Sequence, residues 1–105
     1  AKHYNTAVDH YKETIRLGLY QAEAYNKLAI VLREQGKIEE AIEVLRNAIT
    51  RIPNNFRLHF NLGMMLLEQK RRGAAAEAFR RALEINPNSE KTRKILKSLG
   101  PNDLK

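Results

Sequence analysis

The sequence predicts an all-α fold, a right-handed α-solenoid of antiparallel helix hairpins with about six helices. Three observations lead there. A pattern of apolar and small residues recurs after 34 residues, so that Pro53 returns as Pro87. Within each interval the apolar residues fall three and four apart, as on one face of a helix. Glycine or proline separates most of these segments, at points where helices end. Units of this kind cannot bury their apolar faces alone, so we expect them to stack.

The 34-residue interval aligns two full units, residues 22–55 and 56–89. The aligned pairs are Leu28 with Leu62, Ala29 with Gly63, Leu32 with Leu66, Gln35 with Gln69, Ala41 with Ala75, Leu45 with Phe79, Ala48 with Ala82, and Asn54 with Asn88. Large and small residues therefore alternate in the same order in both units, which indicates the same helix packing twice.

Each full unit is expected to be a helix hairpin. In the first, a helix runs from residue 22 to residue 35 and ends at Gly36, and a second begins at Ile38 and is stopped by Pro53. Residues 56–69 and 72–85 repeat this pair before Pro87. The connections are short, which favours antiparallel packing of each pair.

The two ends of the chain hold incomplete units. Residues 1–20 contain a helix over 4–17 that aligns with the second helix of the full units, because Ala7 and Tyr11 match Ala41 and Leu45. Residues 90–100 form a lysine-rich capping helix that Ser89 begins, and residues 101–105 form a tail. The chain thus opens inside a repeat, and we expect it to be a fragment of a longer repeat protein.

These residues resemble the tetratricopeptide repeat, whose signature is an aromatic, a Leu followed by a small residue and a large residue on the first helix, then Ala, an aromatic, Ala and Pro. The signature residues of the first full unit are Tyr25, Leu28, Ala29, Leu32, Ala41, Leu45, Ala48 and Pro53; those of the next are His59, Leu62, Gly63, Leu66, Ala75, Phe79, Ala82 and Pro87. The resemblance covers nearly the whole chain. It implies a module that binds proteins or peptides.

The chain departs from the pattern at three positions. His59 replaces a bulkier aromatic residue. Lys70 stands where the preceding unit has Gly36, so it must adopt a left-handed backbone or shift the turn toward Gly73. Leu19 stands where the full units have proline, and Gly18 is expected to end that helix instead.

The resemblance implies that the first helix of each pair lines a concave groove. The residues expected to bind a peptide there are Asn26, Lys27, Ile30, Arg57, Phe60, Asn61 and Met64, with Lys91 and Lys94 as further anionic contacts. Phe60 and Met64 are expected to be apolar anchors, and Asn61 to hold the peptide backbone, unless the two apolar residues simply pack against a neighbouring repeat.

Some tetratricopeptide domains hold an acidic C-terminus with a clamp of Lys, Asn and Arg. Asn61 and Lys91 fit that pattern, but Asn26, Ile30 and Ile95 stand where other donors are required. Bidentate recognition of carboxylates tolerates few missing donors, so we do not expect a full two-carboxylate clamp.

Charge and composition indicate which classes of binding partner the chain favours. Residues 53–105 hold 11 basic and 5 acidic side chains and carry +6 of the net +7. This bias favours an anionic partner, whether an acidic peptide, a C-terminal carboxylate, nucleic acid or a membrane surface, without choosing among them. The resemblance adds that the partner is a protein or peptide. RNA or an anionic surface is a lesser alternative, because basic clusters such as 70–72 lack interleaved exposed aromatics. No apolar run is long enough to span a membrane. The compartment stays open, with a soluble, cytoplasmic protein slightly favoured.

The sequence argues against an enzyme and predicts no cofactor and no metal. It has no cysteine and no Gly-rich phosphate loop, and its three histidines, His3, His10 and His59, make no convincing ligand set. The other open function is structural, in which Tyr4, Ala7, Val8 and Tyr11 of the half unit bury their face by self-association or against a missing helix.

Overall fold

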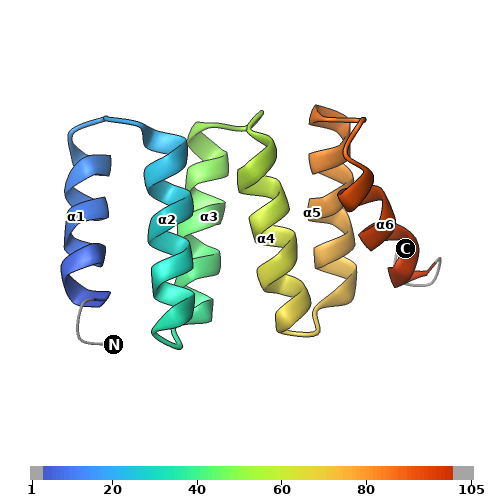
Figure 1. The fold of residues 1–105 in the computed structure, drawn as a ribbon, viewed down its shortest axis with the longest axis horizontal. Coiled ribbons are helices and arrows are strands. Elements are labelled where there is room, and N and C mark those ends of the chain that lie inside the picture. The colour runs from blue at the N-terminus through green and yellow to red at the C-terminus, as the bar shows by residue number, and fades with distance from the viewer. Residues whose placement is uncertain (1–3, 101–105) are drawn as a thin grey trace. The chain divides into compact units, whose positions relative to one another are not determined.

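The computed structural model describes residues 4–100, and the chain divides into two compact units, residues 1–53 and 54–105. Every regular element over the described range is an α-helix (Figure 1), as predicted. The first unit holds α1 (Tyr4–Arg16), α2 (Gln21–Glu34) and α3 (Ile38–Arg51); the second holds α4 (Phe56–Glu68), α5 (Arg72–Ile85) and α6 (Glu90–Leu99). His3 and the tail at 101–105 lie outside the described residues.

In the first unit α2 is the central helix, and both α1 and α3 pack against it in antiparallel fashion (Figure 1). The small residues at the helix crossing, Ala29, Ala41 and Ala48, are fully buried together with Leu45. Small side chains let the backbones approach, and the larger residue fills the space beside them. The predicted hairpin of residues 22–55 is therefore present, with its helices ending a residue or two earlier than predicted.

In the second unit α5 is central and packs against α4 and α6. Gly63 of α4 and Phe79 of α5 meet so closely that a Cβ added to Gly63 would lie 2.8 Å from Phe79 Cε1. At the other end, the Arg72 guanidinium donates a hydrogen bond to the Leu99 carbonyl oxygen over 3.4 Å and ties α5 to the end of α6. The first unit has Ala29 and Leu45 at the positions that correspond to Gly63 and Phe79. The smaller glycine thus goes with the larger phenylalanine, and the larger alanine with the smaller leucine.

The turns after the helices test two expectations, that Gly18 ends the first helix and that Lys70 either adopts a left-handed backbone or shifts the turn. Gly18, Gly36 and Lys70 all have positive φ, at 76°, 85° and 61°. After α2, the Gly36 N–H donates to the Arg33 carbonyl and the Lys37 N–H to the Leu32 carbonyl. The same two bonds recur around Lys70, which identifies a Schellman turn closed by a lysine in place of glycine. Gly18 closes α1 in this way, as predicted.

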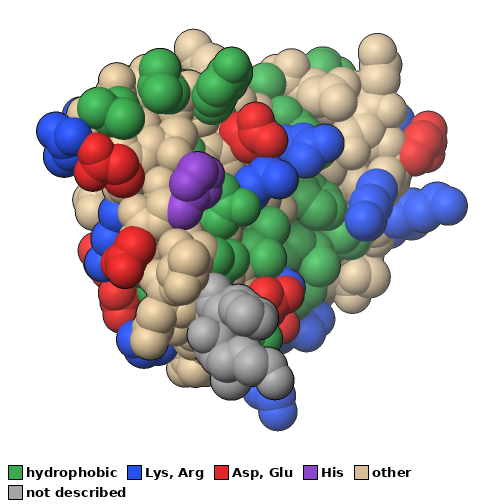
Figure 2. Space-filling view, turned by 60° about the vertical axis from the view of Figure 1, so that its left-hand side comes forward, with side chains coloured by type: hydrophobic (Ala, Val, Ile, Leu, Met, Phe, Trp, Pro, Cys, Tyr) green, Lys and Arg blue, Asp and Glu red, His purple; other side chains and the backbone are tan. Residues whose placement is uncertain are grey.

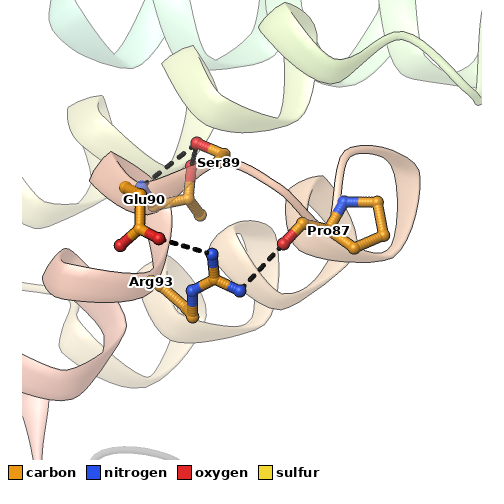
Figure 3. Close-up of polar contacts among 5 residues, drawn as sticks. Pro87, Ser89, Glu90 and Arg93 are labelled. Atoms are coloured by element: carbon orange, nitrogen blue, oxygen red, sulfur yellow. Dashed lines mark hydrogen bonds and ion pairs between the residues drawn. The ribbon is translucent and has the colours of Figure 1, made fainter.

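Two helix N-termini repeat the same side-chain cap at the 34-residue interval. The Asn55 Oδ1 accepts a hydrogen bond of 3.2 Å from the Leu58 N–H at the start of α4, and the Ser89 Oγ accepts one of 3.3 Å from the Thr92 N–H at the start of α6. Figure 3 shows the second cap, where Arg93 also bonds to Glu90 and to the Pro87 carbonyl oxygen. These contacts fix where α4 and α6 begin.

Candidate functional site

The starts of α4 and α6 enclose a shallow hollow of about 290 Å³ within the second unit. We call it the second-unit hollow; it is lined by Phe56, Arg57, Phe60, Asn61, Ser89 and Lys91. The caps at Asn55 and Ser89 set the first turns of the two helices, so the hollow is built on regular secondary structure and not on a loop.

Aromatic rings form one wall of the second-unit hollow. Phe56 and Phe60 stack with their centroids 5.6 Å apart and an interplanar angle of 21°. Phe60 in turn meets the fully buried Phe79 edge to face, also at 5.6 Å. Such pairs contribute about 0.5–1.5 kcal/mol beyond the area they bury. Phe79 therefore holds Phe60, and Phe60 holds Phe56, as a rigid apolar surface.

Cations flank this aromatic wall. The Lys91 Nζ lies 5.5 Å from the centroid of the Phe60 ring, a cation–π distance, and Arg57 is exposed on the first turn of α4. None of the described residues that line the hollow carries a carboxylate. The Asn61 amide adds a group able to donate and accept hydrogen bonds. The arrangement suits an anionic group attached to an apolar one.

Four of the predicted peptide-binding and anionic residues come together here: Arg57, Phe60, Asn61 and Lys91. Met64 is half-buried on α4 and Lys94 is exposed on α6, but neither lines the hollow. Sequence reasoning missed Phe56 and Ser89. Phe56 lies one helical turn before Phe60, so its proximity to that ring was available as a signal. Ser89 was identified only as a cap.

The predicted peptide-binding residues of the first unit do not come together as those of the second-unit hollow do. Asn26 is only 6% exposed, which leaves little of its amide to meet a ligand. Lys27 is exposed, and its Nζ lies 3.7 Å from the Glu23 carboxylate. Lys27 also lines a hollow of about 250 Å³ with His10, Tyr11 and Tyr20 among its neighbours, while Ile30 is half-buried. Of these three residues, Lys27 lines the 250 Å³ hollow, and Asn26 and Ile30 do not.

The face of α1 is less covered than the matching faces of α3 and α5. Ala7 and Tyr11 are half-buried, as is Tyr4, whereas Val8 is buried against the unit. The residues that match Ala7 and Tyr11 are completely buried in the other two helices: Ala41, Leu45, Ala75 and Phe79. The α1 face is therefore the partly open member of an otherwise repeated contact.

Large apolar side chains are also exposed where α1 joins α2. Leu17, Leu19 and Tyr20 are 54%, 50% and 79% exposed. Figure 2 shows hydrophobic side chains standing out at the upper end of the molecule, the end at which Figure 1 places this connection. Tyr20 additionally has a left-handed backbone, with φ of 44°. These exposed apolar side chains directly follow the end of α1, whose face is itself partly open.

Residues 4–100 contain no group of three or more His, Cys, Asp or Glu side chains able to hold a metal ion. No helix over the same range is both long and apolar enough to cross a membrane. The pKa of the Glu13 carboxyl is lowered by the hydrogen bond and charge of Arg16 on the exposed side of α1.

The aligned helix hairpins with their repeated small-to-large contacts define a helical-repeat protein. The family model of the tetratricopeptide repeat matches residues 1–56 and again residues 26–90, so the chain belongs to the tetratricopeptide repeat family. Repeats of this family form helical solenoids, generally mediate protein–protein interactions and are typically non-catalytic.

Proposed function

We propose that this chain is a non-catalytic interaction module that holds a short acidic peptide in the second-unit hollow. The observation that carries the proposal is the pairing of two cations, Arg57 and Lys91, with the Phe56–Phe60 aromatic wall, where no described lining residue is acidic. A ligand that matches it carries a carboxylate close to an apolar side chain.

The aromatic wall and the cations of the second-unit hollow have different effects on peptide binding. The aromatic wall buries the apolar side chain of the peptide and supplies most of the affinity, because rigid aromatic anchors lose little entropy on binding. Arg57 and Lys91 are exposed, and exposed ion pairs contribute only about 0–1 kcal/mol. Their main effect is to attract acidic ligands and to reject basic ones. Asn61 hydrogen-bonds the peptide backbone.

Panning a random-peptide phage library against the full chain tests this function. We expect the selected peptides to be enriched in Asp or Glu next to apolar residues. Fluorescence polarisation with one selected peptide then compares variants. Phe60→Ala, which removes the centre of the wall, should weaken binding about tenfold or more, a loss typical of an aromatic anchor. Asn61→Ala should weaken it by a smaller factor.

A charge-matched pair of variants separates the hollow from the general basic character of the unit. Lys91→Glu places an acid beside Phe60, whereas Lys97→Glu makes the same charge change on α6 at an exposed position that does not line the hollow. The proposal requires Lys91→Glu to impair binding much more than Lys97→Glu. Equal losses, or full affinity in Phe60→Ala, would contradict it.

A second candidate function is structural assembly through the face of α1. It is supported by the partial exposure of Ala7 and Tyr11, whose matching residues in α3 and α5 are completely buried. Sedimentation equilibrium over a range of concentrations measures self-association. Tyr11→Glu should lower the average mass if this face pairs copies of the chain, and Asp9→Lys, an exposed change on the same helix, serves as the control. A concentration-independent monomer mass contradicts this second function.

Binding to RNA or to an anionic surface is less well supported. Three cations of the second unit already pair with glutamates one helical turn away: Arg80 with Glu77, Arg81 with Glu84 and Arg93 with Glu90. Paired cations attract phosphates less, since each pair adds no net charge. An affinity for single-stranded RNA that falls steeply with added salt would revive this alternative.

A further inference from the structure

A larger hollow lies in the first unit, where α1 and α3 flank α2. Its volume is about 530 Å³, which is within the range of roughly 300–1,000 Å³ usual for ligand pockets. We call it the α1/α3 hollow. None of the predicted groove residues of α2, Asn26, Lys27 and Ile30, lines it. It therefore lies on a different surface from the peptide-binding groove that was predicted from the sequence.

The floor of the α1/α3 hollow is apolar and firmly held. Tyr25 and Leu28 of α2 contribute to it and are only 8% and 4% exposed. Ile15 of α1 and Val44 of α3 are half-buried and form the walls. Tyr25 and Leu28 occupy signature positions of the repeat, so packing against the hairpin fixes them. An apolar side chain of a ligand placed here meets a preformed surface and need not reorganise it.

The rim of the hollow is polar, and its charges have one sign. Lys12 of α1 and Arg51 in the last turn of α3 are the charged residues among those that line it. Both are exposed, and neither has an ion-pair partner among residues 4–100. The negative end of the α3 dipole lies beside Arg51 and offsets part of its charge. Lys12 therefore contributes the larger share of the positive potential.

Neutral hydrogen-bonding groups complete the rim. Asn47 and Thr50 of α3 lie between the apolar wall and Arg51 in sequence, and both line the hollow. The Thr50 hydroxyl donates to the Arg46 carbonyl oxygen at 3.1 Å, so its oxygen remains an acceptor for a ligand N–H. The Asn47 amide offers a donor and an acceptor. Apolar floor, cationic rim and neutral amide together match a peptide end better than a purely apolar molecule.

We propose that the α1/α3 hollow is a second ligand site, which binds a peptide segment carrying an apolar side chain next to a carboxylate. The apolar side chain lies between Ile15 and Val44, above the buried Tyr25 and Leu28, and the carboxylate is held by Lys12 and Arg51. Charge complementarity decides the occupant, since both charged lining residues are cations. The carboxylate comes either from a free C-terminus or from an acidic side chain one residue away.

Titrations followed by two-dimensional ¹H–¹⁵N NMR on the full chain test the proposal with minimal probes. N-acetyl-leucine presents both features, N-acetylleucinamide lacks the carboxylate and N-acetylglycine lacks the apolar side chain. We expect saturable shifts from N-acetyl-leucine, centred on the amides that line the hollow, with a dissociation constant in the millimolar range, on the order expected for so small a ligand. Each of the other two probes should bind about fivefold to tenfold more weakly.

Variants and one further probe complete the test. Lys12→Gln and Arg51→Gln should each weaken N-acetyl-leucine about fivefold, while Arg46→Gln, an exposed change on α3 that does not line the hollow, should leave it unchanged. Binding of N-acetyl-leucyl-aspartamide in preference to N-acetyl-leucine assigns the carboxylate to an acidic side chain, and the reverse order assigns it to a C-terminus. Equal binding of the acid and the amide, or shifts centred elsewhere, would overturn the proposal.

Discussion

Replacing Gly63 by alanine tests the closest helix contact in the second unit. A Cβ at this position would lie 2.8 Å from Phe79 Cε1 and 2.9 Å from both Cδ1 and Cζ. Phe79 is completely buried and is held edge to face by Phe60, so its ring has little room to retreat. Overpacking of a core costs about 1–3 kcal/mol. Alanine in a helix regains about 1 kcal/mol over glycine. We therefore expect Gly63→Ala to lower the free energy of unfolding by about 1 kcal/mol.

The first unit supplies the compensating change. There Ala29 and Leu45 occupy the positions of Gly63 and Phe79, and both are completely buried. Phe79→Leu alone removes ring volume and should cost about 1–2 kcal/mol, between the costs of the smaller and larger core truncations. Combined with Gly63→Ala, it should create the alanine–leucine pair of the first unit. The double variant should then be more stable than the sum of the single effects predicts, by about 1 kcal/mol.

Urea denaturation followed by far-ultraviolet circular dichroism measures each free energy of unfolding. Gly73→Ala is the matched control, because this glycine also lies in a helix but a Cβ there would meet nothing within 4 Å. It should leave stability unchanged or raise it by up to about 1 kcal/mol. If Gly63→Ala behaves like Gly73→Ala, or if the two changes at Gly63 and Phe79 are additive, the size-matching argument is refuted.

Three further predictions concern the turns, a cap and an exposed ion pair. Lys70→Gly should raise the free energy of unfolding by about 0.5–1 kcal/mol, because it relieves a left-handed lysine, and Gly36→Ala should lower it; urea titrations with the opposite signs would contradict this. Ser89→Ala should cost about 1 kcal/mol through loss of the α6 cap, with faster amide hydrogen exchange at Thr92 as the local readout, and unchanged exchange would argue against the cap. The Glu13 carboxyl should titrate below its ordinary pKa by NMR, and Arg16→Met should return it. Since the folded pKa is the lower one, the pair's small contribution is present above the unfolded pKa and is lost as the pH falls through the folded value.

Much of the fold could be read from local pattern. Apolar spacing placed the six helices of residues 4–100 within one or two residues of their observed ends, because helix periodicity and glycine or proline stops are local properties. The alignment of Lys70 with Gly36 left two outcomes open, a left-handed lysine or a turn shifted toward Gly73, and the structure shows the first. The position of Phe79 in the core followed from its alignment with Leu45. Each of these inferences needed only the repeat interval and the steric rules of single residues.

The candidate site was only partly predictable, since burial depends on neighbours from other segments. Asn26 has the spacing of a surface residue on α2, yet the packed unit leaves it 6% exposed. Ser89 reaches the second-unit hollow because α6 starts beside α4, and no local pattern reports which residues two separate helix starts bring together. The α1/α3 hollow was missed for the same reason: its lining comes from three helices, and residues such as Lys12 and Arg51 look individually like ordinary solvated cations.

The sequence by itself determined the helices, their pairing into hairpins and the repeat family, because a 34-residue interval with small residues at fixed places permits few packings. Only the tertiary structure decided which side chains share a hollow. Distances such as the 5.5 Å from Lys91 Nζ to the Phe60 ring join residues of different helices, and helix packing sets them, not helix periodicity.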